Sequence, residues 1–267
     1  MVQTISSFQN SRIKEAVRLR ERRERNQSGL FLIEGYRELR RAVDAGRSIE
    51  ALFYSPELFL GENEDALIRE SNARELFCCT PEVFAKISYR DRPDGLLAVS
   101  RQNHLPLSSL ELKKNPFLLI AECIEKPGNL GSILRSCDAA GVDSVLVCDP
   151  MTDIHNPNVV RSSVGTLFTQ PVLEADGEET MAFLKKEKIS LVAATPHAEL
   201  EYTQADFTGP VAIAVGAEQL GLSDRWMQNA DIKVRIPMSG AADSLNVAAA
   251  TTLLLYEVLR QRSALLR

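Results

Sequence analysis

The first segment with side chains suited to chemistry is a short turn that leads into a helix, residues 126–135 (KPGNLGSILR). A helix beginning here presents backbone N–H groups to an anion. The segment lacks the glycine spacing of a dinucleotide fingerprint and the G-K-[ST] of a Walker loop. Asn129 and Arg135 are its polar candidates, and Arg135 points away from the apolar face. The plain alternative for Arg135 is a surface position on an amphipathic helix.

A second segment, residues 211–223 (VAIAVGAEQLGLS), is an apolar run that ends at Gly216 and Glu218. The run predicts a buried strand. Ligands of open α/β sheets bind beyond the carboxyl ends of strands, so Glu218 is well placed for a site. The alternative is an ordinary strand-to-helix turn in which Ser223 caps the next helix.

A third segment joins Ile236-Pro237-Met238-Ser239-Gly240 to Asp243-Ser244-Leu245-Asn246. No charged residue lies between Asp243 and Glu257, and apolar side chains surround the predicted helix, so we expect that helix to be buried. Ser244 and Asn246 then need polar partners near the interior. Helix capping accounts for Ser244 more easily than for Asn246.

The elements that would position these segments alternate regularly. Strand runs are predicted at residues 117–121, 144–148, 191–194 and 211–215, with helices between most of them. This order indicates a mostly parallel sheet covered on both faces. We assign residues 117–267 to this domain and residues 103–116, a polar stretch containing proline, to a linker.

Residues 1–102 form a separate small α/β domain by the same reasoning. Helices are predicted at residues 10–26, from Tyr36 to Gly46 and after Thr80, and strands at 30–33, 52–54 and 96–99. From Arg12 to Arg41 there are ten Lys/Arg against five Asp/Glu, although the whole chain has a net charge of −5. Such a local excess can bind phosphates, and a solvated helix face is the alternative.

Composition narrows the class of protein. The 267 residues are 45% hydrophobic and 25% charged, as in globular domains, and no apolar run reaches 18 residues. The start lacks the pattern of a secretory signal, so we expect a cytoplasmic protein that does not enter a membrane. Five cysteines without a C-x-x-C pair and three separated histidines predict reduced thiols and no metal site.

The three segments, in this order, resemble the motifs of the SpoU (TrmH-like) family in the SPOUT superfamily of RNA methyltransferases. The resemblance covers residues 117–262. It implies a trefoil-knotted α/β fold, S-adenosylmethionine as cofactor, and a homodimer with its sites near the subunit interface. Residues 11–35 are similar to the L30e-like domain that binds substrate in some members, including 23S rRNA 2′-O-methyltransferases.

The resemblance also implies roles for individual residues. Asn129, Arg135, Glu218, Ser244 and Asn246 match its catalytic positions. The cofactor-binding positions are Gly216, Ile236 and Leu245, to which we add Thr195 and Met238. The RNA-binding positions are Arg161, by resemblance, and Arg18, Arg22 and Arg25, from the basic segment.

The implied reaction moves an electrophilic methyl group to a ribose 2′-OH and requires no metal. The protein must align the hydroxyl and assist loss of its proton. Arginine is a poor base, so we favour Arg135 as a fork that holds a phosphate and the 2′-oxygen. Whether Arg135 itself takes the proton stays open.

Three other interpretations compete with 23S rRNA methylation. The substrate could be tRNA, or the chain could be an L30e-like RNA-binding protein without catalytic activity. The set of Asn129, Arg135, Glu218 and Asn246 argues against loss of chemistry. A nucleotide-binding α/β enzyme unrelated to RNA is disfavoured because both phosphate-loop fingerprints are missing.

Overall fold

A computed structural model describes residues 3–264 and divides them into two compact units. The first unit holds residues 3–103 together with Asp153–Thr169, and the second holds His104–Thr152 together with residues 170–264. The segment Asp153–Thr169 was expected in the second domain but packs within the first unit. The domain boundaries at 102 and 117 stay a prediction.

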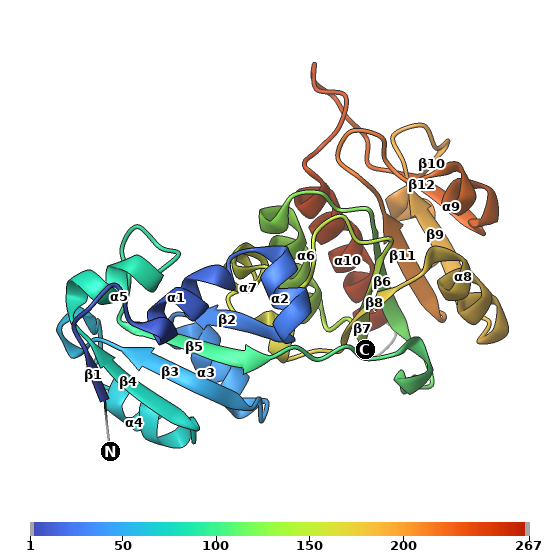
Figure 1. Ribbon diagram of the computed structural model, residues 1–267. Coiled ribbons are helices and arrows are strands. Elements are labelled where there is room, and N and C mark those ends of the chain that lie inside the picture. The colour runs from blue at the N-terminus through green and yellow to red at the C-terminus, as the bar shows by residue number, and fades with distance from the viewer. Residues whose placement is uncertain (1–2, 265–267) are drawn as a thin grey trace. The chain divides into compact units, whose positions relative to one another are not determined.

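The first unit is built on a five-stranded mixed sheet in the order β1-β4-β3-β5-β2 (Figure 1). Strands β1, β4 and β3 are parallel, whereas β5 is antiparallel to both β3 and β2. The strands are β1 (Gln3–Ile5), β4 (Glu75–Cys79), β3 (Ile49–Tyr54), β5 (Leu96–Arg101) and β2 (Leu30–Glu34).

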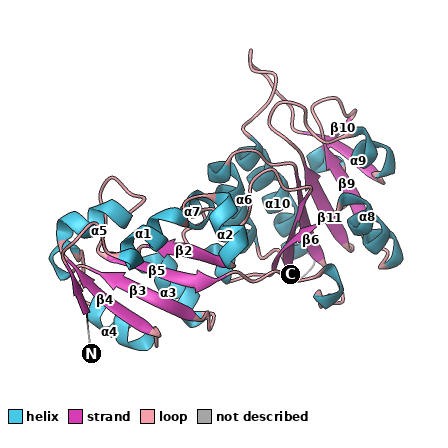
Figure 2. Cartoon of the chain, in the orientation of Figure 1, coloured by secondary structure: helices cyan, strands magenta, loops and turns pink. Residues whose placement is uncertain are grey.

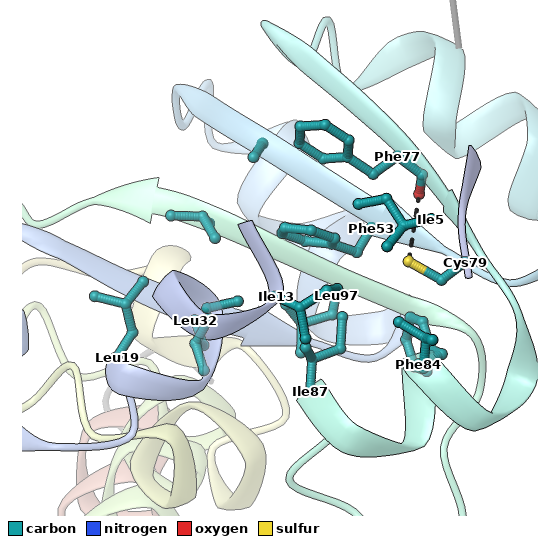
Figure 3. Packing of buried hydrophobic residues seen from close by; sticks show 14 residues of the cluster. Ile5, Ile13, Leu19, Leu32, Phe53, Phe77, Cys79, Phe84, Ile87 and Leu97 are labelled. Carbon is teal, nitrogen blue, oxygen red and sulfur yellow. Dashed lines mark hydrogen bonds between the residues drawn. The ribbon is translucent and has the colours of Figure 1, made fainter. Parts of the chain in front are cut away.

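Helices cover both faces of this sheet. They are α1 (Ser11–Arg18), α2 (Arg22–Ser28), α3 (Tyr36–Asp44), α4 (Glu64–Glu70), α5 (Pro81–Ile87) and α7 (Pro157–Ser162). Ile13 of α1 and Phe84 of α5 pack on the face where Phe53 and Phe77 stack with ring centroids 5.0 Å apart (Figure 3). This dry cluster holds α1 and the end of α5 in fixed positions, which matters for the surface considered below.

The single helix expected over residues 10–26 is wrong, because α1 ends at Arg18 and α2 begins at Arg22. Arg25 explains the break. Its side chain is 1% exposed, and its Nη1 donates to the carbonyls of Leu19 (2.9 Å) and Arg20 (2.6 Å). Carbonyls at a helix end need partners, and here a guanidinium supplies them.

The same guanidinium fixes the segment Asp153–Thr169. Arg25 Nη2 lies 2.6 Å from Asp153 Oδ2, and Arg25 Nε donates to Oδ1 at 3.3 Å. His155, also buried, packs on Phe31 of β2 with ring centroids 4.6 Å apart. The segment therefore closes the β2 edge of the first unit.

The second unit contains a seven-stranded sheet in the order β10-β12-β9-β11-β6-β7-β8, and all its pairs are parallel. The predicted parallel sheet is confirmed. Its strands are β10 (Leu200–Glu201), β12 (Ile232–Arg235), β9 (Ser190–Ala194), β11 (Val211–Val215), β6 (Phe117–Glu122), β7 (Ser144–Cys148) and β8 (Val172–Ala175).

Helices separate most of these strands along the chain (Figure 2). Helices α6 (Pro127–Ala140) and α10 (Val247–Ala264) pack together on one face, and α8 (Gly177–Lys186) and α9 (Asp224–Asn229) lie on the other (Figure 1). Because every strand is parallel, the loops that follow β6, β9, β11 and β12 leave the same edge of the sheet.

Within one chain, the burial predicted for the charge-free helix is incomplete. Helix α10 buries Thr251, Leu254 and Leu255 against the sheet and α6, but Leu253 is 40% exposed and Tyr256 is 48% exposed. Its cap also differs from the expectation. Asn246 Oδ1 accepts from the backbone N–H of Ala248 at 3.0 Å, so Asn246 is the residue that caps α10.

All five cysteines are free thiols. Burial raises the pKa of Cys79 and that of Cys148 to about 12, so both stay protonated at neutral pH. Between residues 3 and 264, none of the helices has both the length and the apolar composition needed to span a membrane.

Candidate active site

A cavity of about 610 Å³ opens at the carboxyl edge of the second unit's sheet. Three loops form most of its wall: the loop after β9, the loop after β11 and the long loop between β12 and α10. Eight of the predicted site residues line it. They are Thr195, Gly216, Glu218, Ile236, Met238, Ser244, Leu245 and Asn246.

A chain of side-chain hydrogen bonds joins the three sequence motifs beside this cavity. Asn246 Nδ2 donates to Asn129 Oδ1 at 3.2 Å, and Asn129 Nδ2 donates to Glu218 Oε1 at 2.5 Å. Each amide is thereby oriented by its neighbour. Residues 89 and 117 positions apart in sequence are held as one polar unit, because α6, α10 and the end of β11 meet there.

The Glu218 carboxylate lies at the N-terminus of α6. Its Oε2 accepts from the backbone N–H of Glu125 at 3.5 Å. Partial burial acts to raise the pKa of Glu218, but the hydrogen bonds from Asn129 and the nearby backbone outweigh it and leave the pKa below its ordinary value. The carboxylate is therefore ionised at neutral pH. The N-terminus of α6, which was expected to bind an anion, lies next to this carboxylate of the chain itself.

A second carboxylate, Glu122 at the end of β6, holds the end of the loop that follows β11. It is 2% exposed. Its Oε2 accepts from the backbone N–H of Ser223 at 2.8 Å, and its Oε1 accepts from Ser223 Oγ at 2.6 Å. Glu122 is not among the residues predicted from the sequence, although a charged residue that ends an apolar strand is a recognisable signal.

The loop between Gly216 and Ser223 folds back on itself. The N–H of Gly221 donates to the carbonyl of Ala217 at 2.9 Å, and Gly221 has φ = +69°. A Cβ at Gly216 would lie 2.2 Å from the carbonyl carbon of Gly221. Glycine is required at 216 for this close approach, and the backbone of the loop is left as the wall of the cavity.

Two of the predicted catalytic residues, Ser244 and Arg135, are not part of this hydrogen-bond chain. Ser244 lines the cavity but is exposed, and capping of α10 falls to Asn246 instead. Arg135 is exposed on α6, and the cavity lining found within residues 3–264 does not include it. Within one chain, the structure does not bring Arg135 together with the other predicted site residues.

The predicted RNA-binding residues all lie in the first unit, Arg161 included. Arg18, Arg22 and Arg161 are exposed. The assignment of Arg25 is wrong, because this side chain is buried and engaged by Asp153 and two backbone carbonyls. A guanidinium so enclosed cannot reach an RNA phosphate.

The charges around the cavity favour a ligand with positive character. The lining includes three carboxylates, those of Glu218, Asp224 and Asp243, and one lysine, Lys126. Much of the remaining wall is apolar, contributed by side chains such as Val215, Leu222 and Val247. An apolar pocket with a few placed polar groups is typical of a site for a small organic ligand.

Comparisons with known proteins agree with this geometry. Residues 116–256 match the SpoU rRNA Methylase family, and residues 10–98 match the MRM3-like substrate binding domain. A 23S rRNA uridine 2′-O-methyltransferase of Streptomyces viridochromogenes is 31% identical over 251 residues, covering 91% of this chain and 87% of that protein.

Solved structures give the same result. An RNA 2′-O ribose methyltransferase is 43% identical with a TM-score of 0.87, over 98% of this chain and all of that one. The SpoU methyltransferase AviRb from S. viridochromogenes, in complex with AdoMet, is 31% identical with a TM-score of 0.87, over 96% of this chain and 99% of that one. The chain therefore belongs to the SpoU rRNA methylase family, with a SPOUT-type parallel sheet and a second, substrate-binding domain.

Proposed function

We propose that this protein transfers a methyl group from S-adenosylmethionine to a ribose 2′-OH of 23S rRNA. The observation that carries the proposal is the Asn246–Asn129–Glu218 chain beside a cavity walled by three strand-following loops. Family membership supports it, because relatives covering most of this chain are named 23S rRNA 2′-O-methyltransferases.

The cavity residues fit S-adenosylmethionine. Its volume of about 610 Å³ is within the range of small-molecule sites. The excess of carboxylates suits a sulfonium cation, and Gly216, which has no side chain, leaves its backbone polar groups open to a ligand. When bound, the cofactor supplies a methyl group that is already electrophilic.

The chain's own residues then hold the reacting groups. Ionised Glu218 orients Asn129, and Asn129 in turn orients Asn246 at the start of α10. Because the pKa of Glu218 is lowered, this carboxylate is a poor proton acceptor and acts by positioning. Thr195, Met238, Ser244 and Leu245 complete the wall from the other two loops.

Arg135 enters the proposal through a second copy of the chain. Helix α6 carries exposed Arg135 and packs on α10, where Ser136 Oγ lies 2.7 Å from Thr252 Oγ1. The exposed Leu253 and Tyr256 of α10 form an apolar face that an aqueous monomer leaves uncovered. We propose that two copies pair over this face, and that Arg135 binds an RNA phosphate and the 2′-oxygen at the assembled site.

The dimer has a direct test. Leu253→Asp combined with Tyr256→Asp places charges on the proposed face and should give a monomer in analytical ultracentrifugation, whereas the wild type should sediment as a dimer at micromolar concentration. A matched control is Lys185→Glu on α8, which is exposed on the other face of the sheet and should leave the dimer intact. A monomeric wild type would contradict this part of the proposal.

The activity is tested by transfer of a tritiated methyl group to transcripts of 23S rRNA and of tRNA, followed by mapping of 2′-O-methyl positions. We expect labelling of 23S rRNA alone. Arg135→Ala should keep cofactor affinity by calorimetry yet lower turnover at least about a hundredfold, because an interaction made in the transition state is lost. If only tRNA were labelled, the substrate would be tRNA and not rRNA. Failure of the wild type to bind the cofactor would refute the proposal.

Several sequence-based expectations stay predictions: the cytoplasmic location, the trefoil knot and catalysis without a metal. Within the described residues, no three His, Cys, Asp or Glu side chains are grouped so that they could hold an ion.

A further inference from the structure

An exposed aromatic ring stands on the first unit, in the loop between α5 and β5. Tyr89 is 39% exposed, although its backbone is firmly held. Its N–H donates to Glu34 Oε2 at 2.7 Å, and the neighbouring Ser88 Oγ donates to Glu34 Oε1 at 2.5 Å. Glu34 is 8% exposed, so the loop is anchored to the interior.

The next residue in the loop adds a second anchor. Arg90 Nη2 forms an ion pair with Glu38 at 2.8 Å and also donates to the backbone carbonyl of Glu34 at 2.8 Å. Arg90 Nη1 lies 3.4 Å from Asp94. Glu38 and Asp94 are both buried, so Tyr89 sits on a loop tied down on both of its sides.

The ring itself is also fixed. Asn158 Nδ2 of α7 donates to Tyr89 Oη at 3.2 Å, and the guanidinium of Arg20 lies over the ring, 5.8 Å from its centroid. Arg20 is held in turn, because it donates to the carbonyls of Lys86 (2.9 Å) and Ser88 (2.5 Å). The ring thus has little freedom to lose on binding, although much of it faces solvent.

Exposed arginines lie on the segments that hold this ring. Arg18 is exposed on the last turn of α1, Arg92 is exposed in the same loop, and Arg161 follows Asn158 by one helical turn of α7. Asp91 is the exposed acid of the loop. A fixed aromatic ring with arginines on the neighbouring segments has the chemistry of a single-stranded nucleic-acid surface, where bases stack and phosphates pair with guanidinium groups.

We propose that Tyr89 is a stacking platform for an unpaired RNA base, with Arg20 behind the ring and Arg161 placed for an adjacent phosphate. This inference rests on the proposed function, because it takes the substrate to be RNA. It adds that the first unit recognises an unpaired nucleotide rather than a regular duplex, since sequence-specific RNA recognition uses bases that are splayed out of helices.

The test measures binding of the full-length protein to a fluorescent 12-nucleotide oligouridylate, to a 12-base-pair RNA duplex and to a 23S rRNA transcript. Tyr89→Ala should weaken oligouridylate binding roughly 5- to 150-fold, the range of one lost base stack. Tyr89→Phe, which keeps the ring and loses only the bond from Asn158, should stay within about threefold of the wild type.

The salt dependence separates stacking from charge. Tyr89→Ala should leave the slope of log K against log salt unchanged, whereas Arg161→Ala should reduce that slope by about one, because only the arginine releases a counterion. Circular dichroism and calorimetry with S-adenosylmethionine check that each variant is folded and keeps the cofactor site of the second unit.

Several outcomes would overturn the platform. One is that Tyr89→Ala binds the oligouridylate and the transcript as tightly as the wild type does. Another is that Tyr89→Phe loses as much affinity as Tyr89→Ala, and a third is that the wild type prefers the duplex. If Tyr89→Ala lost affinity for ribosomal subunits and not for naked rRNA, Tyr89 would instead contact a protein. If the wild type binds rRNA and Tyr89→Ala does not change that affinity, this inference alone is refuted. If the wild type neither binds nor methylates rRNA, the proposed function is refuted.

Discussion

Replacing Asp153 by alanine should unfold the first unit far more readily than replacing any exposed residue of its basic segment. The substitution leaves the Arg25 guanidinium, 1% exposed, without the carboxylate that lies 2.6 Å from it. Removing one partner of a buried ion pair costs about 3–5 kcal/mol, because the remaining charge is uncompensated. The two carbonyls that Arg25 also contacts reduce the loss but carry no charge.

For a unit of this size, a loss of about 3–5 kcal/mol lowers the melting temperature by roughly 10–20 °C. Differential scanning calorimetry measures this. Trp226, the chain's one tryptophan, is buried in the second unit, so its fluorescence reports that unit's transition separately, and we expect that transition to stay in place.

Two further variants isolate the cause. Arg18→Ala, exposed on α1, should change stability by less than about 0.5 kcal/mol. Arg25→Met combined with Asp153→Leu should recover much of the loss, because apolar residues of similar volume often replace a buried ion pair without penalty. This double variant should also keep the wild-type salt dependence of RNA binding. The reasoning is refuted if Asp153→Ala costs less than about 1 kcal/mol, or if the double variant loses a phosphate contact.

Two other predictions concern the second unit. Glu122→Gln removes one acceptor from the clamp on Ser223 and should weaken S-adenosylmethionine binding about 10- to 100-fold by calorimetry. Ser223→Ala, which keeps the backbone bond, should do less, and a Gln variant with normal cofactor affinity would show that the clamp is dispensable. The lowered pKa of Glu218 means that its ionised form stabilises the folded state above the ordinary carboxyl range, and that this stabilisation is lost as pH falls through the lowered pKa. The melting temperatures of wild type and Glu218→Gln should therefore differ at pH 7 and converge toward pH 3, and a constant difference would contradict the assignment.

Much of the architecture was predictable because it depends on local pattern. The runs at 144–148 and 211–215 became β7 and β11 with the predicted bounds, since an apolar run of only five residues between polar turns favours a buried strand over a helix. The apolar face of α6 was also predicted, and Leu130, Ile133 and Leu134 are fully buried. Eight predicted site residues line one cavity because all the strands before them are parallel and end at one edge.

The predictions that failed involve side chains whose roles depend on distant partners. Arg25 has the same local surroundings in sequence as Arg18 and Arg22, yet an aspartate 128 residues away takes it into the interior. The burial predicted for the helix after Asn246 is a different case. The sheet and α6 of one chain leave Leu253 and Tyr256 exposed, and the expected dimer would have to supply the rest of the cover.

The sequence by itself determined the periodicity of the strands and helices, the three polar motifs and the family, because each is a property of neighbouring residues. Only the tertiary structure decided which polar groups meet. The Asn246–Asn129–Glu218 chain, the Glu122–Ser223 clamp and the fixed ring of Tyr89 each join residues 69 to 117 positions apart. Hydrogen bonds act over about 3 Å, so spacing along the chain cannot reveal such pairings.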